Sequence, residues 1–413
     1  MLKIAMLSTG EEVLHGDILD TNAAWLSKRF FEQGFSLTKR STVGDAQSAL
    51  IEELLMLSFN TNIVVVNGGL GPTSDDLSAE AAAEAAEVPL VLFPEWLEKL
   101  TAFFAARGMT MPESNHKQAM LPQNATIIDN PIGTACGFKM EINGCTFYFT
   151  PGVPSEFKRM VDEQILPDMR VNYPDVLGQE CSRWYTFGTS ESGLADKLDK
   201  MVLPDGYMLG YRSYLPYIEV KLFGPKGDLD VRIKLMQMIT RLIDTHVVSI
   251  DQPMQHHVGH LINERKQSIS VAEQSTLGRL STWLHSSPEA SNYCGHGWVL
   301  GHQVDVGYAG SDSLAAVLAL VGATRDKCAT DIALATGKVT DRSFSVAIAT
   351  PEGEWGQMLS FNRQFSADDQ ATLITTVSVD MLRRYLSGKT MFVSYSSLNR
   401  EKEMYVPHNL LAN

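Results

Sequence analysis

The sequence predicts an α/β protein with more than one domain. The segments Lys3–Ser8 and Ile63–Val66 are short and apolar, and each runs into a glycine-containing turn, as buried strands do. Between them, the apolar residues of Asp20–Gly34 recur at helical spacing. This alternation predicts a parallel sheet with helices on both faces. The 413 residues exceed the usual size of one hydrophobic core, so further domains are expected.

The other elements of this first domain follow in order along the chain. Asp20 or Thr21 is placed to cap the first helix. Further strands are expected at Ser36–Val43 and Cys145–Thr150, and further helices at Ala46–Leu57, at Ser78–Ala86 and from Ser155 onward. In such a sheet, the loops after the strands meet beyond the strands' C-terminal ends and build the ligand site.

Two more parts are predicted beyond this first domain, which is assigned to residues 1–175. Residues 176–252 are expected to form a small α+β, KH-like module that contains an amphipathic helix at Leu229–Ile243. Residues 253–413 are expected to form a C-terminal α/β domain with an alternating strand at Ser343–Ala349.

Composition and charge exclude several classes of protein. The net charge of −14 and the absence of a Lys/Arg cluster argue against duplex nucleic acid as a partner. The N-terminal residues lack the features of a signal peptide, and no apolar run approaches the ~20 residues of a membrane span. The five cysteines are scattered and form no C-x-x-C pair. A cytoplasmic protein without disulfides or membrane contact is therefore expected.

A glycine-rich loop follows the apolar strand directly, with the sequence Gly68-Gly69-Leu70-Gly71-Pro72-Thr73-Ser74-Asp75-Asp76. Its glycines let the backbone turn tightly and approach a ligand, and a side chain at Gly71 would take the space of a phosphate. Thr73 and Ser74 supply hydroxyl donors, and the next helix directs its positive dipole end at the loop. The two adjacent carboxylates would repel a phosphate unless a divalent cation bridges them or one acts as a base. We therefore predict a phosphate site with Asp75 and Asp76 as catalytic residues.

Other polar or glycine-rich segments also follow predicted strands or open predicted helices. They are Ser8–Glu12, Gly16–Asn22, Val43–Asp45, Asn130–Phe138 and Thr150–Glu156. Each by itself is typical of a turn, but all are expected at the edge where such a sheet builds its site.

Together these segments resemble the CinA family. The family pattern contains T-G-x-E-[LV]-L-x-G, D-T-N, V-G-D, G-G-L-G-P-T-x-D-D, N-x-x-G-T-A-x-G and P-G-V-P-x-E, and all occur here in order. The resemblance implies a molybdopterin-binding fold for the N-terminal domain, with a parallel or mixed sheet and helices on both faces. It also implies a pyrophosphatase that acts on ADP-ribose and depends on Mg²⁺, Mn²⁺ or Co²⁺. A homodimer is expected.

The resemblance also implies roles for individual residues. Gly68, Gly69, Gly71, Thr73 and Ser74 would surround the phosphates, and Asp45, Asp75 and Asp76 would bind the metal or activate water. Glu11, Asn22 and Glu156 would lie at the rim of the site. Asn130, Thr134, Gly152 and Pro154 complete the expected substrate-binding set.

The family's C-terminal domain looks like a nicotinamide mononucleotide deamidase, whose serine nucleophile is helped by a tyrosine and a lysine. Here Ser291 keeps the nucleophile position, but Gly301 and Val306 replace the two activating residues. In the A-E-S-C-T-G-G stretch, Gln274 replaces the first serine and Leu277 replaces a glycine. An unactivated serine is a poor nucleophile. We therefore predict a degenerate, inactive site that retains Ser291, Gln274, Thr276 and Thr336.

Three functions remain open from the sequence. The first is metal-dependent hydrolysis of a dinucleotide pyrophosphate such as ADP-ribose, and the second is binding or transfer of a pterin. The third is a non-catalytic, nucleotide-sensing regulatory or scaffold role linked to competence or DNA damage. Asp75 and Asp76 favour hydrolysis, because two carboxylates do not help to bind an anion alone.

Overall fold

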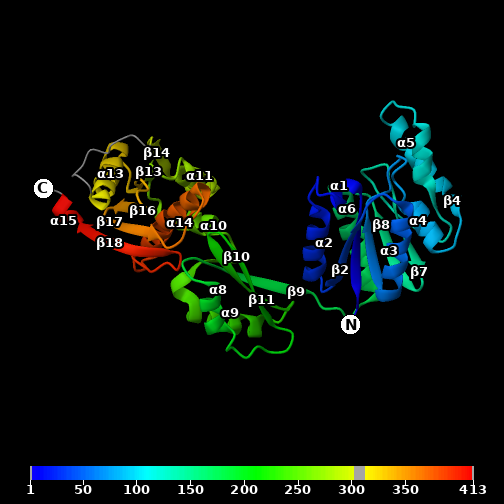
Figure 1. The fold of residues 1–413 in the computed structure, drawn as a ribbon, viewed down its shortest axis with the longest axis horizontal. Helices are drawn as coiled ribbons and strands as arrows, with labels where there is room; N and C mark the ends of the chain where they lie inside the picture. The colour runs from blue at the N-terminus through cyan, green and yellow to red at the C-terminus, as the bar shows by residue number, and fades with distance from the viewer. Residues whose placement is uncertain (1, 302–311, 412–413) are drawn as a thin grey trace. The chain divides into compact units, whose positions relative to one another are not determined.

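The structure is a computed structural model that describes residues 2–301 and 312–411 (Figure 1). The chain divides into two compact units, Met1–Glu180 and Cys181–Asn413. The predicted boundary at residue 175 falls near the end of the first unit, whereas the predicted boundary at residue 252 lies inside the second. Val306 and its neighbours 302–311 lie outside the described residues.

The N-terminal unit is built around one mixed sheet. Within the described residues its strand order is β2-β1-β3-β8-β7-β6, in which the first four strands are parallel and β7 and β6 are antiparallel. The strands are β1 Ile4–Thr9, β2 Leu37–Val43, β3 Ile63–Asn67, β6 Thr126–Ile128, β7 Gly137–Ile142 and β8 Cys145–Thr150, with β4 Leu90–Leu92 and β5 Met120–Pro122 as a separate pair. The four parallel strands were predicted. A mixed sheet was within the prediction, but the individual strands β6 and β7 of its antiparallel edge were not predicted.

Helices cover both faces of this sheet, as predicted (Figure 1). Alternate residues of β1 point to opposite faces: Ala5 and Leu7 join one hydrophobic core, and Ile4 and Met6 join the other. The first core is covered by α3, α4 and α5, and the second by α2, α6 and α7. The helices are α1 Glu11–Leu14, α2 Thr21–Glu32, α3 Gln47–Asn60, α4 Ser78–Ala85, α5 Pro94–Ala105, η1 Glu113–Ala119, α6 Pro154–Met160, η2 Val161–Ile165 and α7 Leu166–Asn172.

The C-terminal unit begins with a four-stranded sheet in the order β10-β11-β9-β12. Its elements are β9 Gln179–Thr186, α8 Glu191–Leu198, β10 Met208–Tyr214, β11 Tyr217–Pro225, α9 Leu229–Ile243, η3 Asp244–His246 and β12 Val247–Ile250. Trp184, Val220 and Leu222 of the sheet pack with α8 and α9 in one hydrophobic core. The predicted amphipathic helix at Leu229–Ile243 is confirmed residue for residue.

A second sheet of the same unit has the described order β14-β13-β15-β16-β17-β18. Strands β14, β13 and β15 are parallel, and β15 to β18 pair antiparallel. Helix α13 packs on one face and helices α10, α11 and α14 on the other. The elements are α10 Met254–Arg265, β13 Ile269–Glu273, α11 Arg279–His285, α12 Pro288–Ser291, β14 Cys294–Val299, α13 Ser313–Cys328, β15 Ile332–Thr336, β16 Ser343–Thr350, β17 Gly353–Phe361, α14 Ala367–Leu386, β18 Leu398–Pro407 and α15 His408–Leu411.

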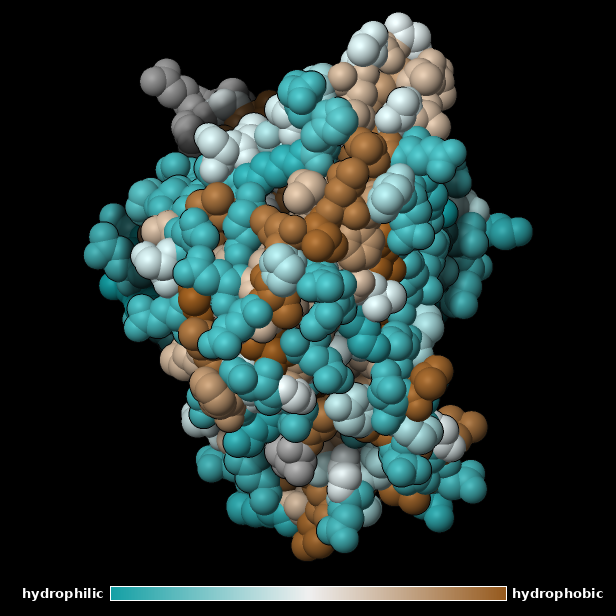
Figure 2. Space-filling model, turned by 90° about the vertical axis from the view of Figure 1, so that its right-hand side faces the viewer, coloured by the Kyte–Doolittle hydropathy of each residue, from teal (hydrophilic) through white to brown (hydrophobic). Residues whose placement is uncertain are grey.

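The surface is mostly hydrophilic on the face shown in Figure 2, where hydrophobic side chains form patches among hydrophilic ones. Some exposed hydrophobic side chains of the N-terminal unit belong to Ile18, Leu19 and Val153, and they contribute to the site described below. Among the described residues, no helix combines the length and hydrophobicity that crossing a membrane requires.

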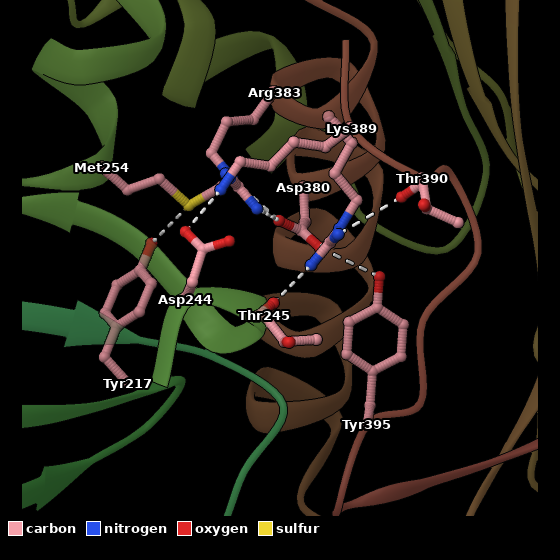
Figure 3. Close-up of polar contacts among 10 residues, drawn as sticks. Tyr217, Asp244, Thr245, Met254, Asp380, Arg383, Lys389, Thr390 and Tyr395 are labelled. Carbon is pink, nitrogen blue, oxygen red and sulfur yellow. Dashed lines mark hydrogen bonds and ion pairs between the residues drawn. The ribbon is translucent and has the colours of Figure 1, made fainter. Parts of the chain in front are cut away.

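A buried ionic cluster links the two sheets of the C-terminal unit (Figure 3). Asp380 of α14 accepts hydrogen bonds from Arg383 Nη2 and from Arg384 Nε, both at 2.7 Å, and from the Tyr395 hydroxyl at 3.2 Å. Arg384 also donates to the carbonyl of Thr245, at 2.9 Å. Thr245 lies in η3, next to the four-stranded sheet, so the predicted module shares polar contacts with the C-terminal domain.

Candidate functional site

The glycine loop after β3 is held by the start of α4 and by the end of β8. Gly68 and Gly69 have φ values of +114° and +66°, a region that favours glycine. The Gly68 N–H donates to the Thr150 carbonyl at 2.9 Å, and the Ser78 hydroxyl donates to the Gly68 carbonyl at 2.9 Å. The predicted tight turn is therefore present, and its position is fixed by hydrogen bonds to elements on both sides.

Two buried polar atoms beside this loop have no hydrogen-bond partner among the described residues. They are Thr9 Oγ1, at the end of β1, and Asn22 Oδ1, in the first turn of α2. Both residues line the cleft, and both are almost fully buried, with exposed fractions of 5% and 6%. A Cβ atom at Gly68 would lie 2.5 Å from Thr9 Oγ1, which places this hydroxyl against the glycine loop. Buried polar atoms are almost always hydrogen-bonded to protein, water or ligand, so these two are open to a bond from a molecule in the cleft.

Asn22 also links helix α2 to strand β3 and to the loop after β8 through its amide nitrogen. Its Nδ2 donates to Asn67 Oδ1 at 2.9 Å and to the Gly152 carbonyl at 2.8 Å. Asn67 in turn donates to the Pro151 carbonyl at 2.7 Å. Asn22 was predicted at the rim of the site. The structure shows that its side chain is almost fully buried and lines the cleft.

Asp76 is bound within its own loop. Its Oδ2 accepts a hydrogen bond from the Thr73 N–H at 2.9 Å and a second, short one from the Thr73 hydroxyl. A Cβ atom at Gly71 would overlap the Asp76 carboxylate. The predicted reason for glycine at position 71, namely space for a phosphate, is therefore incomplete. Any side chain there would first displace the carboxylate that shapes the loop.

Other carboxylates lie around the mouth of the cleft. Asp45 Oδ2 accepts from the Glu11 N–H at 3.2 Å, and the Asp45 N–H donates to Glu11 Oε1 at 3.1 Å. Burial raises the pKa of Asp45, and the nearby negative charges of Glu12, Asp75 and Glu11 raise it further. The hydrogen bond from the Glu11 N–H lowers this pKa, but it does not outweigh them. The Thr73 hydroxyl, the backbone N–H of Asp75 and the positive charge of Lys117 lower the pKa of Asp75. Within the described residues, no three His, Cys, Asp or Glu side chains are grouped to hold a metal ion.

The loop before β7 closes another side of the cleft. Asn130 Oδ1 accepts from the Gly133 N–H at 3.1 Å, and Asn130 Nδ2 donates to Glu156 Oε2 and to the Ala135 carbonyl, both at 2.7 Å. A Cβ atom at Gly133 would overlap the Glu156 carboxylate. Asn130 therefore shapes the loop that presents Thr134, while Thr134 and Glu156 themselves line the cleft.

The cleft has a volume of about 500 Å³. This falls in the range of small-molecule sites, roughly 300–1,000 Å³. Most of the predicted residues line it, namely Gly68, Gly69, Gly71, Asp75, Asp76, Asn22, Asp45, Thr134, Gly152, Pro154 and Glu156. The other predicted residues, Glu11, Thr73, Ser74 and Asn130, are not among those that line it. Glu11 and Thr73 contact lining residues, as Asn130 does.

Gln118 lines the cleft and was not predicted. It lies in η1, its Oε1 accepts from Asn115 Nδ2 at 2.8 Å, and its Nε2 donates to the Leu70 carbonyl at 3.2 Å. It therefore supports the glycine loop from the side. Nothing in the local sequence indicates this role, because η1 reaches the loop only through the tertiary fold.

We expect Asp76→Ala to lower the free energy of unfolding of the N-terminal unit by about 1 kcal/mol, because the Thr73 N–H loses its partner. Asp76→Asn should cost less, because its amide oxygen can still accept from Thr73. Thermal unfolding of the full chain would measure both. Asp75→Ala serves as the control, because that carboxylate is exposed. If Asp76→Ala proves no more destabilising than Asp75→Ala, Asp76 does not hold the loop.

The residues of the predicted deamidase site fall into two places in the C-terminal unit. Gln274, Thr276 and Thr336 lie together and are buried: the Gln274 N–H donates to Thr336 Oγ1, and the Thr276 and Thr336 hydroxyls are 3.2 Å apart. Ser291 instead ends α12, where its hydroxyl donates to the carbonyl of Pro288 at 3.0 Å. The Ser291 hydroxyl is thus directed at its own helix.

Family models match both ends of the chain. Residues 5–171 match the model described as "Probable molybdopterin binding domain", and residues 251–357 match that of the CinA C-terminal domain. The fold and the cleft thus define a protein in which a molybdopterin-binding-type α/β domain precedes a CinA-type domain. A CinA-like protein of Shewanella loihica is 40% identical over 97% of this chain and 99% of its own length. The chain belongs to the CinA family.

One further curated protein and two solved structures are also similar to this chain. The NMN amidohydrolase-like protein YfaY of Escherichia coli K12 is 40% identical over 94% of this chain and 95% of its own. The solved CinA structure of Thermoplasma acidophilum is 26% identical and covers 40% of this chain and 97% of its own, with a TM-score of 0.36. The molybdopterin biosynthesis enzyme MoaB of Thermus thermophilus is 17% identical and covers 43% and 96%, with a TM-score of 0.29.

Proposed function

We propose that the N-terminal unit binds a phosphorylated, nucleotide-like molecule in the glycine-loop cleft and hydrolyses its pyrophosphate bond with a divalent cation. The observation behind this proposal is the pair of buried, unpartnered atoms in the cleft, Thr9 Oγ1 and Asn22 Oδ1. Such atoms cost free energy unless a ligand bonds them. A hydroxyl donates to a phosphate oxygen, and an amide oxygen accepts from a ligand hydroxyl or amine. ADP-ribose, which the family resemblance implies, offers both kinds of partner.

We expect the phosphates to bind at the glycine loop. Its backbone approaches the cleft without side chains at Gly68 and Gly69, and Thr9 Oγ1 lies directly beside it. Lys117 supports the loop from outside the cleft: its Nζ donates to the Thr73 carbonyl at 3.1 Å, and Glu80, at 3.1 Å, balances its charge. Successive backbone N–H groups of a loop can hold an anion even on a protein of net negative charge.

The carboxylates at the mouth of the cleft fit a hard divalent cation. Asp45 and Asp75 are the residues that would hold it, because both line the cleft and neither is bound as tightly into its loop as Asp76. Mg²⁺ is commonly held by one or two carboxylates together with substrate phosphates, so a preformed group of three protein ligands is not required. When bound, the cation would neutralise the phosphate charge that the carboxylates otherwise repel.

A substrate screen tests this proposal. We expect the purified full chain to hydrolyse ADP-ribose or a related dinucleotide with Mg²⁺, Mn²⁺ or Co²⁺, and to stop when EDTA removes the cation. Asp75→Asn should reduce turnover, whereas Asp17→Asn should not, because exposed Asp17 does not line the cleft. Undiminished turnover in EDTA would refute the metal dependence. Binding without turnover of any dinucleotide or pterin phosphate would leave a sensing or scaffold role.

We also propose that the C-terminal domain lacks nicotinamide mononucleotide deamidase activity. The hydroxyl of Ser291 donates to the Pro288 carbonyl, and glycine occupies position 301 in place of an activating tyrosine. General-base assistance alone contributes roughly 10²–10⁴ in rate.

The expected result is no ammonia release from nicotinamide mononucleotide by the full chain, with wild type and Ser291→Ala indistinguishable. A coupled ammonia assay measures this. Turnover near the ~1 s⁻¹ of evolved enzymes that Ser291→Ala abolishes would contradict the proposal. Other residues would then have to activate the serine.

A further inference from the structure

The cleft of the N-terminal unit has an apolar wall that the phosphate chemistry does not use. Ile18 and Leu19, in the segment between α1 and α2, line it together with Val153, in the loop between β8 and α6. Their exposed fractions are 52%, 85% and 50%, so these large aliphatic side chains are open to a ligand in the cleft.

These two apolar segments are held close to each other by the Asn22 hydrogen bonds. Leu19 lies three residues before Asn22, and Val153 directly follows Gly152, whose carbonyl accepts from Asn22 Nδ2 at 2.8 Å. The Ile18 N–H donates to the Glu12 carbonyl at 3.2 Å, and the Thr21 N–H donates to the Leu19 carbonyl at 2.7 Å. The wall is therefore backed by backbone hydrogen bonds on each side of the apolar pair.

A ligand that bound only at the glycine loop through its phosphates would leave these side chains exposed to water. Small-molecule sites usually combine an apolar wall with a few fixed polar groups, and each part recognises a different portion of one ligand. An aliphatic wall gives no partner to a sugar hydroxyl or a phosphate, but it packs against the face of a flat ring. The volume of about 500 Å³ accommodates more than a bare diphosphate.

We infer that Ile18, Leu19 and Val153 form the binding site for a flat heteroaromatic ring, the base of the phosphorylated ligand. This inference rests on the proposed function, since it assigns the rest of the molecule whose phosphates occupy the glycine loop. The three side chains are specificity-determining residues. They select a nucleotide over a sugar phosphate or free pyrophosphate by covering the ring.

The test compares two probes that resist hydrolysis and differ by a nucleoside. They are α,β-methylene-ADP and methylenediphosphonate, titrated calorimetrically into the full chain in the presence of Mg²⁺. Variants Ile18→Ser and Leu19→Ser remove apolar contact, and Leu177→Ser is the matched control. Leu177 is 68% exposed in the same unit and does not line the cleft.

We expect each cleft variant to bind α,β-methylene-ADP about tenfold more weakly or worse, and to bind methylenediphosphonate as the wild type does. Leu177→Ser should change neither affinity. The proposed ring-binding site would be contradicted if the cleft variants lost affinity equally for both probes, or lost no affinity for the nucleotide probe. The ring site would also be contradicted if the wild type bound the nucleotide probe no more tightly than methylenediphosphonate. In that case the proposed phosphate site would still be supported. If the wild type binds neither probe, the proposed function itself fails.

Discussion

Asp380→Ala should lower the free energy of unfolding of the C-terminal unit by about 3–5 kcal/mol, the cost of removing one partner from a buried ion pair. Asp380 is almost fully buried, and Figure 3 shows it beside Arg383. It also pairs with Arg384, and the side chains of Arg383 and Arg384 have exposed fractions of 3% and 5%. Without the carboxylate, two guanidinium groups would remain buried without a counter-charge. For a unit of this size, the melting temperature should fall by about 6–20 °C.

The matched control for this variant is Asp368→Ala on the same helix. Asp368 pairs with Arg279, but its side chain is 73% exposed, so the loss should be about 0–1 kcal/mol. Differential scanning calorimetry of the full chain would follow the transition of each unit separately. If the two variants melt at the same temperature, the buried cluster does not stabilise the unit.

The pH dependence gives a second readout of the same cluster. Burial alone would raise the pKa of Asp380, but the charges and hydrogen bonds of Arg383 and Arg384 outweigh it and lower the pKa. Because this pKa is lower in the folded state, the stabilisation is complete above the unfolded value of about 3.9. It is lost as the pH falls through the folded value. The difference in stability between wild type and Asp380→Ala should therefore shrink below about pH 4.

The sequence predicts the parallel part of the N-terminal sheet well, because its signals are local. The run Ile63–Val66 is apolar at every position and is flanked by turns, so it could be assigned to a buried strand before any contact was known. The Asp20 cap is equally local: its carboxylate accepts from the Ala23 N–H at 2.8 Å, as predicted. The edge strand β6 gave no such signal, because three residues are too few to show a period.

The site was predicted in outline but not in its hydrogen bonds. Motif positions placed Gly68, Asp45 and Glu156 at one edge, and all three line the cleft. The sequence could not show that Asp76 would be bound by Thr73 while Asp75 stays exposed, since both are simply adjacent acids. The sequence also could not show that the Thr9 hydroxyl has no partner among the described residues. Its surroundings depend on how β1, β3 and the glycine loop pack together in the fold.

Gly68→Ala should weaken binding of α,β-methylene-ADP by at least tenfold and up to roughly 150-fold, the equivalent of one lost hydrogen bond to a charged group. The added Cβ would lie 2.5 Å from Thr9 Oγ1 and 2.8 Å from the Thr9 carbonyl oxygen. One of these is the backbone of a buried strand, which cannot move away without disturbing β1. The hydroxyl must therefore turn away from the position in which it would meet a phosphate oxygen.

Backbone strain alone cannot produce this result, and Gly108→Ala separates the two effects. Gly108 also has positive φ, at +67°, but a Cβ there would meet nothing within 4 Å, and the residue does not line the cleft. Its substitution should cost stability of about 1–2 kcal/mol without changing affinity. Calorimetric titration of both variants measures the difference. Should Gly68→Ala bind the probe as tightly as Gly108→Ala does, the phosphate does not sit against Gly68, and Thr9 Oγ1 must be satisfied in another way.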